Sequence, residues 1–155
     1  MEEKILFHVE EGGKAPTHEA ELRAWIRSVI TERGGEAGPI NYIFCGDDYL
    51  HQLNVEYLDH DTLTDIITFP YATFPRVSGD LFISVERVAD NARDLKTDFT
   101  DEWHRVIIHG VLHLCGQGDK TEEEAAAMRD SEDWALDMRP LGLKEAAGTQ
   151  VQGKD

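Results

Sequence analysis

The sequence predicts a single α+β domain in which one sheet of about four strands carries helices on its faces. Three observations predict this fold. The chain has 155 residues, the usual size of one domain with a sizeable core. Apolar residues make up 41% of it, as in ordinary globular proteins. Strand-like and helical segments alternate without an internal repeat or a long linker. We therefore expect one domain over residues 1–140 and a flexible C-terminal tail over 141–155.

Four short segments have the composition of β-strands. KILFHVE at 4–10 places apolar side chains at every second position, which is the period of a strand with one buried face. The other three segments are PINYIFCG at 39–46, DIITFPY at 65–71 and GDLFISV at 79–85. Glycine, proline and aspartate flank these segments, as is typical of turns between strands.

Five further segments have the periodicity of helices. The first, at 17–35, has an apolar stripe, with Thr17 as its expected N-cap and a pair of glycines at its end. The other four helices are expected at 47–58, 86–95, 99–116 and 121–139. Thr100 is the expected cap of the helix at 99–116. Thr121 and Glu124 have the spacing of a capping box at the start of the last helix.

Charge and cysteine content limit the function classes that fit the chain. The formal charge of −16 at pH 7 repels a polyanion, so contact with nucleic acid requires a local cation such as a metal ion or an arginine cluster. Two cysteines, Cys45 and Cys115, form no disulfide framework and fit a reducing compartment. The sequence contains neither an apolar run of membrane-spanning length nor the pattern of a signal peptide. We therefore expect a cytoplasmic protein that does not contact membranes.

The most informative segment is HRVIIHGVLHLCGQGDK at 104–120. His109 and His113 are four residues apart in a predicted helix, so they lie on nearly the same face. Gly116 ends that helix and lets the chain turn back, which brings Asp119 towards the two rings. Two imidazoles and one carboxylate, with a fourth position open to water, are typical of a catalytic zinc site. The spacing H-x3-H-x5-D therefore predicts one divalent metal ion, with zinc as the default and nickel or iron as alternatives.

Two other interpretations of the histidine helix stay open at this point. In the first, His109 and His113 are core residues of an apolar helix and bind no metal. Burying two imidazoles without partners costs several kcal/mol, and a metal ion would remove that cost. In the second, the site belongs to a zinc peptidase. Peptidases of the H-E-x-x-H type carry a glutamate general base directly after the first histidine, whereas this chain has Gly110 there.

Three segments resemble the YbeY family of bacterial metal-dependent endoribonucleases, which are implicated in ribosomal RNA maturation. HGVLHLCGQGD is similar to the family motif H-G-x-L-H-L-x-G-x-x-H. LNVEYLDHDTLTDIITF at 53–69 is similar to L-N-x-x-[FY]-R-x-x-D-x-P-T-[DN]-V-L-S-F, and SGDLFIS at 78–84 to G-D-I-x-I-S. The resemblance covers residues 40 to about 137 in the same order. It implies a mixed four-stranded sheet with helices packed on it and a metal site at the end of a central helix.

The resemblance also implies a function and partners. The implied activity is a single-strand-specific endoribonuclease in rRNA processing and ribosome biogenesis. The implied partners are single-stranded RNA, rRNA, and the ribosome or its proteins. The motifs contain no signal for an oligomeric state. A non-catalytic, ribosome-associated module that uses the metal only to hold its fold together is the alternative to an enzyme.

The chain departs from the family pattern in ways that affect the site. Asp119 stands where the pattern has its third metal histidine, and aspartate is also an acceptable zinc ligand. The arginine of the pattern falls on Leu58. Its proline falls on residue 63, a leucine here. His60 and Arg76 are candidates to compensate for this arginine. Arg105 is a further candidate for a phosphate contact, with a surface salt bridge to an acidic neighbour as the alternative. The catalytic residues therefore remain unassigned at this stage.

Overall fold

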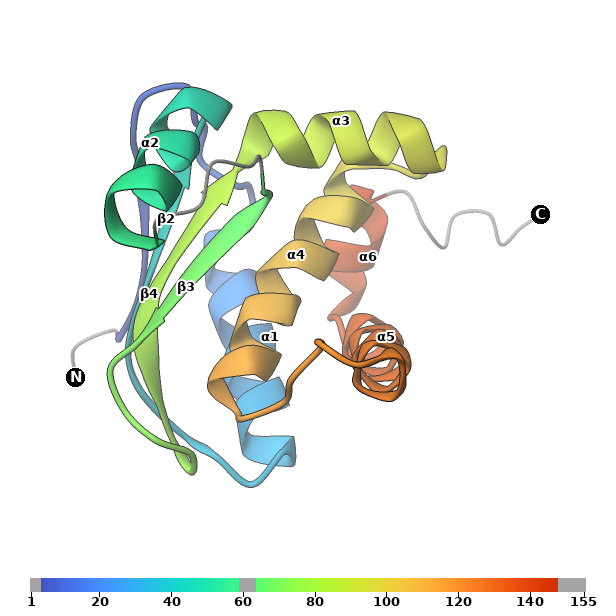
Figure 1. Cartoon of the computed structure of the whole chain (residues 1–155). Helices are drawn as coiled ribbons and strands as arrows, with labels where there is room; N and C mark the ends of the chain where they lie inside the picture. The colour runs from blue at the N-terminus through green and yellow to red at the C-terminus, as the bar shows by residue number, and fades with distance from the viewer. Residues whose placement is uncertain (1–3, 59–63, 148–155) are drawn as a thin grey trace.

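The four strands form one mixed sheet in the order β1-β2-β4-β3 (Figure 1). The strands are β1 (Ile5–Val9), β2 (Glu36–Cys45), β3 (Ile66–Pro70) and β4 (Arg76–Ser84). β1, β2 and β4 run parallel, whereas β3 is antiparallel to β4 and forms an edge of the sheet. This arrangement comes from a computed structural model, which describes residues 4–58 and 64–147. It confirms the predicted α+β class and the mixed sheet.

Six helices pack around this sheet in the described residues. They are α1 (Glu19–Glu32), α2 (Asp47–Leu58), α3 (Val85–Leu95), α4 (Phe99–Leu114), α5 (Glu122–Asp137) and α6 (Leu141–Ala147). Helices α1 and α4 cover one face of the sheet, and α5 and α6 pack on α4 from the side away from the sheet (Figure 1). Helix α2 contacts β3 and β4 from the opposite face. None of these helices is long and apolar enough to cross a lipid bilayer.

The alternation of side chains along β2 explains where the core lies. Ile40, Tyr42 and Phe44 are fully buried under α1 and α4. The Tyr42 hydroxyl donates a hydrogen bond to the carbonyl oxygen of Ile107 in α4, at 2.9 Å. Helix α4 is therefore a central helix with the sheet on one side and α5 and α6 on the other. This position accounts for its largely apolar sequence.

Two predicted helix caps were wrong, whereas the capping box at the start of α5 is confirmed. Helix α1 begins after His18, which adopts a left-handed conformation at φ 59°, and no side chain caps it. Thr17 hydrogen-bonds to the His18 ring instead. Helix α4 is capped by Asp98, whose carboxylate accepts from a backbone N–H of the first turn at 3.1 Å. Thr100 lies inside that turn, because the helix begins two residues earlier, at the Asp98 cap.

The expected tail was also wrong for its first seven residues. Residues 141–147 form helix α6, with Leu143 and Ala147 buried in the core. A helix this short is marginal by itself, so packing against α1 and α4 must stabilise it. Seven residues are also too few to show a clear helical period in the sequence. Residues 148–155 lie outside the described part of the chain.

Replacing Leu143 by alanine is expected to lower the free energy of unfolding by about 2–4 kcal/mol, because it removes a fully buried side chain. Leu141 provides a matched control on the same helix, since its side chain is 65% exposed. Its replacement by alanine is expected to change stability by less than about 0.5 kcal/mol. Urea unfolding of both variants measures the difference. Equal losses would show that α6 does not contribute to the core.

Candidate metal centre

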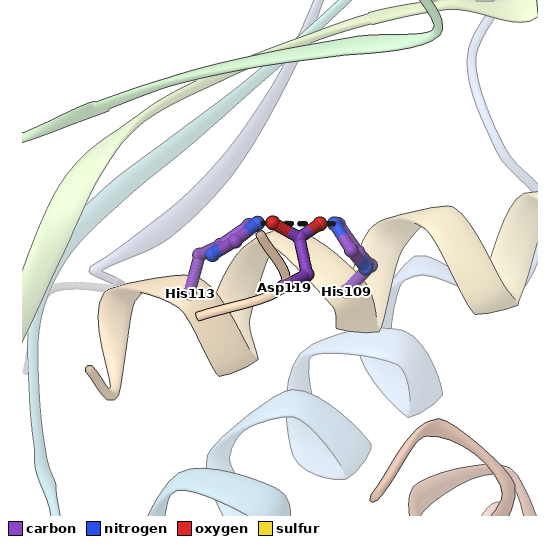
Figure 2. A group of neighbouring side chains, drawn as sticks. All are labelled: His109, His113 and Asp119. Carbon is purple, nitrogen blue, oxygen red and sulfur yellow. Dashed lines mark ion pairs between the residues drawn. The ribbon is translucent and has the colours of Figure 1, made fainter. Parts of the chain in front are cut away.

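The three predicted ligands converge on one point at the C-terminal end of α4 (Figure 2). One nitrogen of His109, one nitrogen of His113 and one carboxylate oxygen of Asp119 lie within 4.8 Å of one another. The Oδ2 atom of Asp119 is 3.4 Å from Nε2 of each histidine. No second group of this kind occurs within residues 4–58 and 64–147. The observed convergence is therefore the one that the helical spacing and the glycine turn predict.

A tight turn after α4 brings Asp119 back to the histidines. Gly116 has a φ of +92°, a conformation that glycine adopts without steric cost. Its backbone N–H donates to the His113 carbonyl at 2.9 Å, and the N–H of Gln117 donates to the Leu112 carbonyl at 3.1 Å. The carbonyl oxygen of Gln117 lies 2.9 Å from Nδ1 of His113. The same turn therefore returns the chain to the site and orients one of the rings.

Glu132 on α5 orients the other ring. Its Oε2 atom lies 2.7 Å from Nδ1 of His109, so Nε2 of that ring faces Asp119. The other oxygen of Glu132 is 2.8 Å from Arg105, and Arg105 also contacts Asp133 at 2.7 Å. The Glu132 side chain is only 8% exposed. Sequence analysis missed this residue, because it stands in an acidic helix with no spacing that connects it to His109.

Electrostatics keep Glu132 ionised next to His109. Burial by itself would raise the pKa of the Glu132 carboxyl, but hydrogen bonds from His109 and Arg105 lower that pKa overall. Burial would likewise lower the pKa of His109, whereas the hydrogen bond and the charge of Glu132, together with Asp119 and Asp65, raise it. The His109 ring is therefore in a field that favours a positive charge at its nitrogen atoms.

The donor set fits a divalent transition metal. Both histidines use Nδ1 for a contact within the protein and leave Nε2 directed at the Asp119 carboxylate. A carboxylate or carbonyl partner on the second ring nitrogen is the usual arrangement around metal-binding histidines. Two neutral imidazoles and one aspartate are also a common catalytic zinc set.

The candidate ligands form part of the wall of a cleft of about 670 Å³. The cleft is also lined by residues of β3 and by Asn54 and Leu58 of α2. Gly110 shows how closely the sheet approaches α4 here. A Cβ atom at this position would lie 2.8 Å from Cδ1 of Ile66 and 2.9 Å from a methyl group of Leu81. A larger side chain at this position would require the ends of Ile66 and Leu81 to move. With glycine here, the chain lacks the glutamate general base of an H-E-x-x-H site.

Two of the three phosphate-contact candidates, Arg105 and Arg76, lie outside the cleft. Arg105 is held by Glu132 and Asp133 and does not line the cleft. Arg76 is the first residue of β4, opposite Glu36, and does not line the cleft either. His60 falls outside the described residues, as does the leucine at position 63.

His104 does not belong to the site, although it precedes His109 on the same helix. Its ring is buried, and its Nδ1 atom lies 2.9 Å from a guanidinium nitrogen of Arg139. Burial, together with the Arg139 charge, lowers the pKa of His104 to about 4. The ring is therefore a neutral core residue that accepts a hydrogen bond at neutral pH.

Comparison with known proteins identifies relatives over most of the chain. The family model for endoribonuclease YbeY matches residues 8–139. A protein named endoribonuclease YbeY from Flavobacterium johnsoniae is 53% identical over 114 residues, which are 74% of this chain and 82% of that protein. A protein of the same name from Porphyromonas gingivalis is 43% identical over 148 residues, 96% of this chain and 95% of its own.

A solved structure supports the fold independently. The solution structure of TM1509 from Thermotoga maritima matches with a TM-score of 0.63 at 19% sequence identity. The match covers 96% of each chain. At this level of identity the likeness bears on the fold alone, and it agrees with the single α+β domain described above.

Proposed function

The chain belongs to the endoribonuclease YbeY family, and from this premise we propose that it cleaves single-stranded RNA in the cleft beside α4. Family membership makes the protein a metal-dependent endoribonuclease, a hydrolase that acts on RNA. His109, His113 and Asp119 would hold the metal ion. The convergence of their ligand atoms within 4.8 Å, on the wall of a cleft, is the observation that carries this location.

The donor set suggests which metal is bound, and the relatives suggest the substrate, the partners and the compartment. Two imidazole nitrogens and one carboxylate oxygen suit zinc, and nickel and iron accept the same ligands. Ribosomal RNA is the proposed substrate. The ribosome or its proteins are the proposed partners, and the cytoplasm is the proposed compartment.

The chain's own residues prepare the site for this chemistry. When bound, a divalent ion neutralises negative charge on the phosphoryl group and lowers the pKa of bound water. Glu132 and the Gln117 carbonyl occupy Nδ1 of the two rings, which leaves each Nε2 lone pair available as a donor. Asp119 adds a negative charge where the family pattern has a neutral ring. The cleft supplies space for a nucleic-acid strand next to these groups.

Metal removal tests the proposal against its alternatives. Protein purified without chelator is expected to contain about one divalent ion per chain, measured by elemental analysis. EDTA is expected to abolish cleavage of a single-stranded oligoribonucleotide, and added zinc should restore it. Far-UV circular dichroism recorded in EDTA separates catalysis from structure. Loss of the fold without any measurable RNase activity would instead support a metal-stabilised module, and casein hydrolysis without RNA cleavage would support a peptidase.

A further inference from the structure

The cleft around the candidate ligands has an excess of acidic groups. Asp65 and Asp119 line it, and Glu132 lies directly behind His109. A phosphate that enters the cleft approaches these carboxylates in a chain of formal charge −16. Coulomb repulsion at such short range opposes RNA binding, and one metal ion shared among these groups offsets only part of it. A second cation in the cleft would favour binding of the strand.

Lys120 is the single lysine or arginine among the described residues that line this cleft. Its side chain is exposed and forms no ion pair with any other described residue. The nearby Glu124 is already engaged at the start of α5. One oxygen of its carboxylate accepts from the backbone N–H groups of Lys120, at 3.0 Å, and of Thr121, at 3.3 Å. The Lys120 ammonium is therefore available for a ligand.

Two arginines near α4 and the turn that follows it already have partners. Arg105 forms ion pairs with Glu132 and Asp133 at 2.8 and 2.7 Å. The Arg33 guanidinium donates to the side chain of Gln117 and lies 5.5 Å from the centre of the Trp134 ring. Neither residue lines the cleft.

We propose that Lys120 contacts a phosphate of the RNA strand in the cleft, beside Asp119. This inference rests on the proposed function, because it requires RNA to occupy the same cleft as the ligand residues. A lysine ammonium suits this contact, as a flexible point charge with three donors. Leu58, at the position of the arginine in the family pattern, lines the same cleft. The chain thus carries its phosphate-binding cation after α4 instead of at the end of α2.

Salt-dependent RNA binding tests the contact without relying on catalysis. Affinity for a fluorescent single-stranded 2′-O-methyl oligoribonucleotide, used as a non-cleavable probe, is measured by anisotropy on the metal-containing protein at several KCl concentrations. Lys120→Gln is expected to weaken binding about tenfold at low salt. It should also reduce the slope of log affinity against log salt by about 0.7, the value for one phosphate contact on a single strand. Lys120→Arg should keep both the affinity and the slope.

Lys4→Gln is the matched control, because it removes the same charge from an exposed residue beside β1. That strand forms the edge of the sheet opposite β3. The RNA affinity of Lys4→Gln and its salt dependence should equal those of the wild type. Equal slopes for Lys120→Gln and Lys4→Gln would overturn the proposal. Cleavage that persists in EDTA would instead count against the proposed metal-dependent function, so the two failures are distinguishable.

A charge relocation provides a second test. Leu58→Arg in the Lys120→Gln background places a cation at another position that lines the same cleft. This double variant is expected to bind RNA at least threefold more tightly than Lys120→Gln. Its slope of log affinity against log salt should return to the wild-type value. Absence of recovery would overturn the inference that Lys120 stands in for a cation at position 58. Steady-state kinetics should show a raised KM and a nearly unchanged kcat for Lys120→Gln, which distinguishes a binding contact from a general structural defect.

Discussion

Replacement of His113 by alanine is expected to lower RNA cleavage by at least about a thousandfold, because it removes one of the three proposed ligands and with it the electrostatic stabilisation that a bound metal ion would supply. The metal content of the purified variant should fall well below one ion per chain. The fold should persist, since the His113 side chain is 29% exposed and lies at the edge of the core. Cleavage of a single-stranded oligoribonucleotide, followed by gel analysis, gives the rate.

His8 provides the control for this experiment. Its side chain is exposed and has a hydrogen-bonding partner, Asn41 at 2.9 Å, but it lies on β1 at the other edge of the sheet. His8→Ala should retain wild-type cleavage and metal content. Equal cleavage by the wild type and His113→Ala would point to a contaminating nuclease and would remove the evidence for this active site.

Replacement of Glu132 by glutamine is expected to weaken metal binding by about ten- to a hundredfold, which is the usual effect of losing a carboxylate partner of a metal-binding histidine. Glutamine retains the shape but not the charge that raises the pKa of His109. It also leaves Arg105 without one of its two anionic partners. Competition with a fluorescent zinc chelator measures the affinity, and NMR titration of the His109 ring in metal-free protein should show a lowered pKa.

Asp133→Asn is the matched control for Glu132→Gln. Asp133 is the neighbouring residue, it contacts the same arginine at 2.7 Å, and its side chain is 58% exposed. Its replacement removes the same charge without touching His109, so the metal affinity should change by less than about threefold. If both variants lose affinity equally, net charge near the site matters and the orientation of His109 by Glu132 does not.

The convergence of the three proposed ligands could be predicted because it is local. His109, His113 and Asp119 fall within eleven consecutive residues, where the helical period and the glycine turn set the geometry. The same local rules identified the four strands and the capping box of α5. The family resemblance added the mixed sheet, which periodicity alone does not specify. These features depend on neighbours in the chain, whose relative positions the backbone stereochemistry restricts to a few choices.

Other features depend on which elements pack together. Glu132 meets His109 only because α5 lies against α4, across a separation of 23 residues. Helix α6 forms because Leu143 finds a place in the core. Lys120 stands out as a binding residue only when the partners of Arg105 and Arg33 are known. The sequence by itself therefore determined the class of fold and the convergence of the three proposed ligands. The tertiary structure decided how the ligands are oriented and which cation remains available, because both depend on contacts between segments that are distant along the chain.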